Sequence, residues 1–182
     1  MKKFGIISLM PDEVRDYHQE LRLRLVAQFG LSVNLNVPAH ITIKYPFLVE
    51  DIDEIERVVQ EFCNSQAQTG WFLQGFNHFI NNDSYVVFID VVSPAETRIA
   101  HSKFLDKLRD VSWIQWGHFD TADLHYHVTL ATHGLTAENF ESVWSFLNQQ
   151  RKPNFKVFFD NLAFVQIEES SRSVYKIYQF QN

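Results

Sequence analysis

The sequence is poor in the residues that several function classes require. Of its 182 residues only Cys63 is a cysteine, which excludes an internal disulfide and a zinc site built from cysteines. Basic residues are also outnumbered, since 16 lysines and arginines face 22 acidic residues and give a net charge of −6. A protein that grips long duplex nucleic acid carries a net basic face, so this class is disfavoured. A small or terminal phosphate needs only one or two local cations and stays compatible.

Long apolar runs are missing as well, and no stretch approaches the roughly 18 residues of a membrane span. Residues 4–10 are apolar, but Pro11 and two acidic residues follow at once, which favours a buried strand over a secretion signal. With 46% hydrophobic and 21% charged residues, the chain is suited to a folded domain with a sizeable core. We therefore expect a cytoplasmic protein without membrane contact.

Hydrophobic periodicity and helix-start signals predict the same order of elements twice along the chain. Strands are expected at about 4–10, 39–45, 71–80, 84–92, 124–131, 154–168 and 173–180. Helices are expected at about 11–28, 51–62, 94–108 and 136–147, and polar turns at 81–83 and 168–172. The pattern predicts an α+β fold made by internal duplication, with two mainly antiparallel sheets and helices packed outside. We expect one bilobal domain over 1–182, with lobe 1 at about 1–80, lobe 2 at about 84–182, and terminal segments that cross between lobes.

A short signature occurs once in each half, on the expected central strand. It is His40-Ile41-Thr42-Ile43 in the first half and His127-Val128-Thr129-Leu130 in the second. Alternate side chains of a strand share a face, so His and Thr point one way while the aliphatic residues anchor the strand. With eight histidines and seven threonines in the chain, chance yields fewer than one His-x-Thr triplet. A duplicated pair on equivalent strands therefore indicates a shared function.

The chemistry of these side chains suits phosphoryl transfer. Imidazole titrates near neutrality, so two histidines at one pocket can serve as general acid and general base in a single displacement. Two threonine hydroxyls beside them can donate hydrogen bonds to the non-bridging oxygens of a phosphate. The residues alone do not decide which histidine is the base.

These paired motifs, together with the stretch from Pro38 to Phe47 and the bilobal pattern, resemble the two-histidine phosphoesterases. That family includes 2′-5′ RNA ligase-like proteins and cyclic nucleotide phosphodiesterases, and the resemblance covers essentially the whole chain. It implies a central, pseudo-twofold cleft, no cofactor, and 2′,3′-cyclic or 2′-5′ linked phosphate substrates at nucleotides or RNA ends. It also implies that His40, Thr42, His127 and Thr129 form the catalytic quartet.

Four further residues are candidates for substrate binding. Many members of the family have a basic residue soon after the second motif, where this chain has Ala131-Thr132-His133. Lys44 is in phase with His40 and Thr42, so it is predicted to supply the cation instead; its alternative is an exposed lysine at a strand end. His125, in phase with His127, is expected beside the cleft. Tyr45 and Tyr175 are expected to stack a base, with core packing as their alternative.

Two other functions compete with a metal-independent phosphodiesterase. One is a binding module of the same fold that holds nucleotides or RNA ends without turnover. The other is a metal-dependent hydrolase in which His125 and His127 bind a metal together with Asp120 or Asp123. A third ligand at suitable spacing is not evident, so we expect no metal, and a monomer that acts on a small nucleotide or an RNA terminus.

Overall fold

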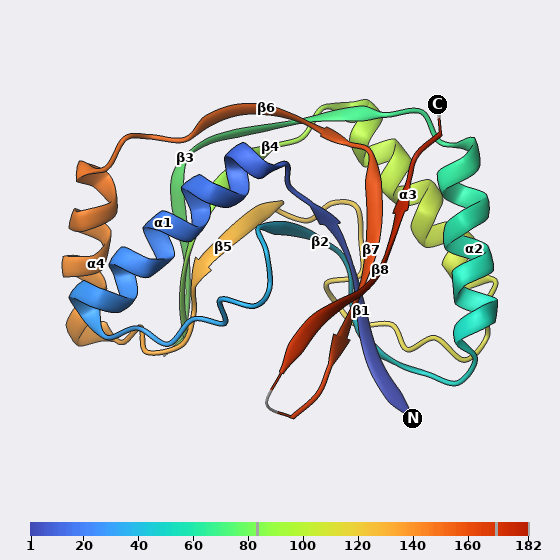
Figure 1. Cartoon of the computed structure of the whole chain (residues 1–182), viewed down its shortest axis with the longest axis horizontal. Helices are drawn as coiled ribbons and strands as arrows, with labels where there is room; N and C mark the ends of the chain where they lie inside the picture. Colours follow the sequence, from blue (N-terminus) through green and yellow to red (C-terminus); the bar gives the residue numbers. More distant parts are fainter. Residues whose placement is uncertain (83, 170, 182) are drawn as a thin grey trace.

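The computed structural model describes residues 1–82, 84–169 and 171–181, and its elements alternate as the sequence predicts (Figure 1). The helices in these residues are α1 (Asp12–Phe29), α2 (Ile52–Ser65), α3 (Ala95–Arg109) and α4 (Ala137–Gln149). The strands are β1 (Lys2–Leu9), β2 (His40–Val49), β3 (Thr69–Asn81), β4 (Ser84–Val92), β5 (His127–Ala131), β6 (Asn154–Phe159), β7 (Asn161–Ile167) and β8 (Arg172–Gln179). No helix among the described residues has the length and apolar character needed to cross a membrane. The turns predicted at 81–83 and 168–172 each include a residue, Asp83 and Ser170, that lies outside the described residues.

The strands form two four-stranded antiparallel sheets, which confirms the predicted α+β class. One sheet has the order β2-β1-β7-β8 and the other has the order β5-β4-β3-β6. In both sheets the motif strand is an edge strand and not the expected central strand, and it pairs with the first strand of its own half, β2 with β1 and β5 with β4. The duplication seen in the sequence therefore appears in the sheets as two equivalent strand pairs.

Strand β3 does not follow the predicted boundary between residues 80 and 84, whereas the crossing of the terminal strands between the two halves was expected. Strand β3 joins the sheet of β4, β5 and β6, while β7 and β8 return from the end of the chain to pair beside β1. The strand predicted at 154–168 is in fact two strands in different sheets, which separate at Asp160. Hydrophobic patterning locates a strand but not its partner, because both sheets bury similar apolar faces.

The helices also exchange between the two halves of the sequence. Helices α1 and α4 contact the sheet of β3 to β6 at one end of the molecule, and α2 and α3 pack together at the other end (Figure 1). Helices α1 and α3 each contribute a buried histidine that contacts the motif strand of the opposite half. His18 of α1 bonds the Thr129 carbonyl at 2.8 Å, and His101 of α3 bonds the Ile43 carbonyl at 2.7 Å. These two bonds fix the positions of β5 and β2.

The two buried histidines predict a loss of stability in acid. Burial lowers the pKa of His18 to about 3 and that of His101 to about 4, whereas both ionise near 6.5 in the unfolded chain. Below pH 6.5 the unfolded state therefore binds protons that the folded state excludes, and stability falls as the pH drops toward 4. At pH 5 the loss should reach about 2 kcal/mol for each histidine at most. Urea unfolding at pH 7 and pH 5 measures it, and His101→Gln, which cannot ionise, should have a smaller difference between the two.

Candidate active site

The two motif strands have the same local irregularity. Strand β1 pairs Ile7 with Thr42 and Ile6 with Lys44, so β2 has one extra residue after its threonine. Strand β4 pairs Phe88 with Thr129 and Val87 with Ala131, which places an extra residue at the same point of β5. A β-bulge breaks the alternation of side chains along a strand. In both strands, therefore, side chains alternate regularly from the histidine to the threonine, and this alternation is interrupted directly after the threonine.

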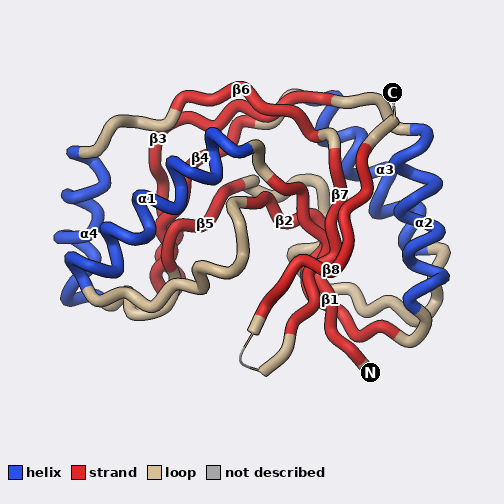
Figure 2. The backbone as a smooth tube through the Cα atoms, in the orientation of Figure 1, coloured by secondary structure: helices blue, strands red, loops and turns tan. Residues whose placement is uncertain are grey.

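The two histidine rings are held in the same way. The Nδ1 atom of His40 bonds the carbonyl of Pro38 at 2.8 Å, and that of His127 bonds the carbonyl of His125 at 2.9 Å. A carbonyl only accepts, so each Nδ1 carries the proton and each Nε2 is left available for proton transfer. Strands β2 and β5 contact each other at the centre of the molecule (Figure 2).

The motif side chains from both strands line one cleft of about 570 Å³. His40, Thr42, His127 and Thr129 are all half-buried there. The side chains of the predicted quartet thus line one and the same cavity. Burial lowers the pKa of both His40 and His127 below the usual value for histidine.

The cations of the cleft are two arginines rather than the predicted lysine. Arg22 of α1 is 8% exposed, and its guanidinium donates to the carbonyls of Asn34 and Val37. Arg172, at the start of β8, also lines the cleft and is exposed. Both positive charges act on His40 and contribute to its lowered pKa. Their charge can attract an anion, although Glu168 and Glu169 line the same cleft.

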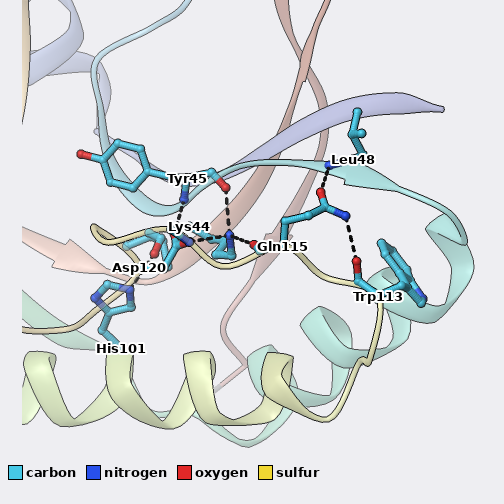
Figure 3. Close-up of polar contacts among 9 residues, drawn as sticks. Lys44, Tyr45, Leu48, His101, Trp113, Gln115 and Asp120 are labelled. Atoms are coloured by element: carbon cyan, nitrogen blue, oxygen red, sulfur yellow. Dashed lines mark hydrogen bonds and ion pairs between the residues drawn. The ribbon is translucent and has the colours of Figure 1, made fainter.

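Lys44 is absent from the cleft, which corrects the role predicted for it. Its side chain is 1% exposed, and the ammonium lies 2.9 Å from the Asp120 carboxylate and 2.9 Å from the Gln115 carbonyl (Figure 3). The bulge after Thr42 turns Lys44 out of phase with the motif, so the simple alternation used for the prediction fails. Through its bonds to Gln115 and Asp120, the lysine instead holds the long segment between α3 and β5 against β2.

The other three residues predicted to bind substrate, Tyr45, His125 and Tyr175, differ in their position relative to the cleft. Tyr45 lines the cleft, and Asp120 accepts a bond from its backbone N–H at 3.0 Å. His125 does not line the cleft, since its ring turns to the Asp90 carboxylate at 2.6 Å. Tyr175 is exposed on β8 and contacts Phe4 in place of the cleft. Of these three residues only Tyr45 is placed to touch a bound molecule.

Neither acidic residue of the metal-dependent alternative lines the cleft, since Asp123 is exposed elsewhere and Asp120 is buried beside Lys44. Asp120 accepts bonds from Lys44, from the backbone of Tyr45 and from the backbone of Gly117. Within residues 1–82, 84–169 and 171–181 no group of three or more histidine, cysteine or acidic side chains is arranged to hold a metal ion. Of the residues in that alternative, His127 alone lines the cleft within the described parts of the chain.

Sequence reasoning overlooked three cleft residues on other elements: His18, Arg22 and Arg172. His18 and Arg22 are four residues apart on α1 and share its buried stripe with Leu21 and Leu25. A histidine and an arginine on an otherwise apolar helix face were the signal that could have found them. Arg172 follows a polar turn and carries no such signal.

Comparisons with known proteins agree with this architecture. The family model of the 2′-5′ RNA ligase superfamily matches residues 10–170. The crystal structure of TT0787 from Thermus thermophilus aligns with a TM-score of 0.72 at 16% identity, covering 100% of this chain and 99% of that one. Escherichia coli LigT, crystallised with 3′-AMP, aligns at 0.60 with 12% identity and the same coverage. At these identities the two structures support the fold alone.

A curated relative matches part of the sequence. It is a Geobacillus kaustophilus protein whose name describes it as a phosphoesterase, 30% identical over 67 residues. The match spans 37% of this chain and 35% of the length of that relative. The family model, in contrast, extends over most of the chain and includes both His-x-Thr motifs. The chain belongs to the 2′-5′ RNA ligase superfamily.

Proposed function

We propose that this protein is a phosphodiesterase that acts on small nucleotide or RNA-end phosphates by acid–base catalysis between His40 and His127. The observation that carries the proposal is the pair of imidazoles, each anchored through Nδ1 and each lining the same cleft. Thr42 and Thr129 supply hydroxyl donors beside them. The family membership and the phosphoesterase name of the partial relative support a phosphoesterase-type activity.

The substrates that fit best are nucleoside 2′,3′-cyclic phosphates and 2′-5′ linked dinucleotides, because both present a phosphodiester beside a ribose. LigT crystals hold 3′-AMP, ATP and NADP⁺, which supports a nucleotide of similar size for this cleft. Arg22 and Arg172 offer positive charge to the phosphate, and Tyr45 offers an aromatic face at the wall. No metal is needed, since the two imidazoles complete both proton transfers.

The experiment is a screen of both substrate classes in EDTA, with the position of the phosphate in the products read by chromatography. Turnover in chelator supports the phosphodiesterase, and the product position identifies which bond breaks. Measurable nucleotide binding without turnover would support the alternative of a binding module. Activity that EDTA removes and Mn²⁺ or Zn²⁺ restores would favour a metal-dependent enzyme.

The dependence of rate on pH is expected to be bell-shaped. One histidine must be neutral to take a proton and the other charged to give one, so kcat/KM should fall on both sides of an optimum. Because burial lowers the pKa of both histidines, the free enzyme should be most active on the acid side of pH 7. Rates from about pH 4 to 9, with folding checked at each point, measure the profile. A rate that rises steadily to pH 9 would contradict two-histidine catalysis.

A further inference from the structure

The two halves of the site differ at one equivalent position. In the sheet of β1 and β2, the residue directly opposite His40 is Leu9. In the sheet of β4 and β5, the residue directly opposite His127 is Asp90. Side chains of directly opposed residues lie on the same face of an antiparallel pair. The duplicated scaffold therefore gives one catalytic histidine an aliphatic neighbour and the other a carboxylate.

Asp90 is joined to His127 through His125. The Nε2–H of His125 donates to the Asp90 carboxylate at 2.6 Å, and the backbone carbonyl of His125 accepts the Nδ1–H of His127 at 2.9 Å. Asp90 also accepts from the backbone N–H of Val91 at 3.0 Å. The carboxylate thus fixes the segment that orients His127, and its negative charge favours the protonated form of that ring.

The charged groups that act on His40 are positive, although Glu168 and Glu169 also line the cleft. Arg22 approaches from α1 and Arg172 from β8, while His18 of α1 and His127 of β5 are the other titratable neighbours. Arg22 has no carboxylate partner among the described residues, because its bonds go to backbone carbonyls. Around His127 the titratable neighbours are Asp90 of β4, His40 of β2 and His125, which lies two residues before the start of β5. The carboxylate of Asp90 thus favours a proton on His127, whereas the two arginines disfavour one on His40.

We propose that Asp90 and His125 are positioning residues that hold His127 as the general acid, which makes His40 the general base. The inference rests on the proposed function and deepens it. In the forward displacement, His40 Nε2 takes the proton of the attacking hydroxyl as its oxygen bonds to phosphorus. The bond from phosphorus to the leaving oxygen breaks, and the Nε2–H of His127 protonates that oxygen. Solvent then removes the proton from His40 and returns one to His127, which restores the starting state.

The first test is an NMR titration of the histidine ring protons in the free protein. We expect His127 to become protonated at a higher pH than His40. Asp90→Asn keeps the shape of the side chain and removes its charge, so the pKa of His127 should fall by about half to one pH unit while that of His40 stays unchanged. Glu13→Gln removes the same charge from an exposed site on α1 and should shift neither histidine. His40 titrating above His127, or no response to Asp90→Asn, would overturn the assignment.

The second test follows the alkaline limb of kcat/KM, which reports deprotonation of the acid. In Asp90→Asn this limb should move to lower pH by the same interval as the NMR value, whereas a merely structural role would lower the rate equally at every pH. His125→Gln keeps a donor for Asp90 and removes a competing positive charge, so its alkaline limb should not move to lower pH. If no phosphodiester is turned over while the NMR order holds, the proposed function fails and the charge asymmetry stands.

Discussion

Replacing His40 or His127 with alanine is expected to lower kcat by about 10²–10⁴-fold on the best substrate of the screen. Each variant removes the imidazole that carries one of the two proton transfers, and the alanine that replaces it cannot carry a proton. Both rings are half-buried and bond only to a backbone carbonyl through Nδ1, so the fold should tolerate their loss. Single-turnover rates, with stability checked by urea unfolding, measure the effect.

The threonines and a distant histidine provide the controls for this result. Thr42→Ala and Thr129→Ala should reduce the rate less, because each removes one oxygen contact and no proton transfer. His118→Ala changes an exposed histidine outside the cleft and should match the wild type. Wild-type turnover in His127→Ala would refute two-histidine catalysis, and a loss confined to KM would assign that ring to binding alone.

Removing the ammonium of Lys44 is expected to cost stability rather than catalysis. Lys44→Met leaves the Asp120 carboxylate buried without its charge partner, and breaking a buried ion pair typically costs about 3–5 kcal/mol. The pair also anchors the segment that holds Tyr45 at the cleft wall (Figure 3), so a smaller rise in KM should accompany the loss. Urea unfolding of the variant measures the main effect.

Two further variants separate the ion pair from other roles of the lysine. The double variant Lys44→Met with Asp120→Asn removes both charges, and it should recover part of the stability, as a double-mutant cycle would show. Arg57→Met breaks an exposed pair with Glu61 on α2 and should cost about 1 kcal/mol or less. Unchanged stability in Lys44→Met together with a large rise in KM would restore the substrate-binding role that the sequence predicts.

Several features of the site were readable from local pattern. His40, Thr42, His127 and Thr129 could be selected because a strand repeats every two residues, so a duplicated His-x-Thr unit defines a face without knowledge of the rest of the fold. Lys44 was assigned to that same face by the same rule, and there the rule fails. The β-bulge that turns Lys44 away from this face arises where β2 pairs with β1, and the sequence of β2 alone does not indicate the bulge.

By itself, the sequence determined the α+β class, the two strands that carry the His-x-Thr motifs and most of the order of helices and strands, because each depends on the periodicity of neighbouring residues. Tertiary structure alone decided which sheet each strand joins, that α1 carries Arg22 to the motif of its own half and His18 to that of the other, and that Asp90 faces only one of the two histidines. These features depend on contacts between residues far apart in the chain, where partner choice is set by packing and charge rather than by local pattern.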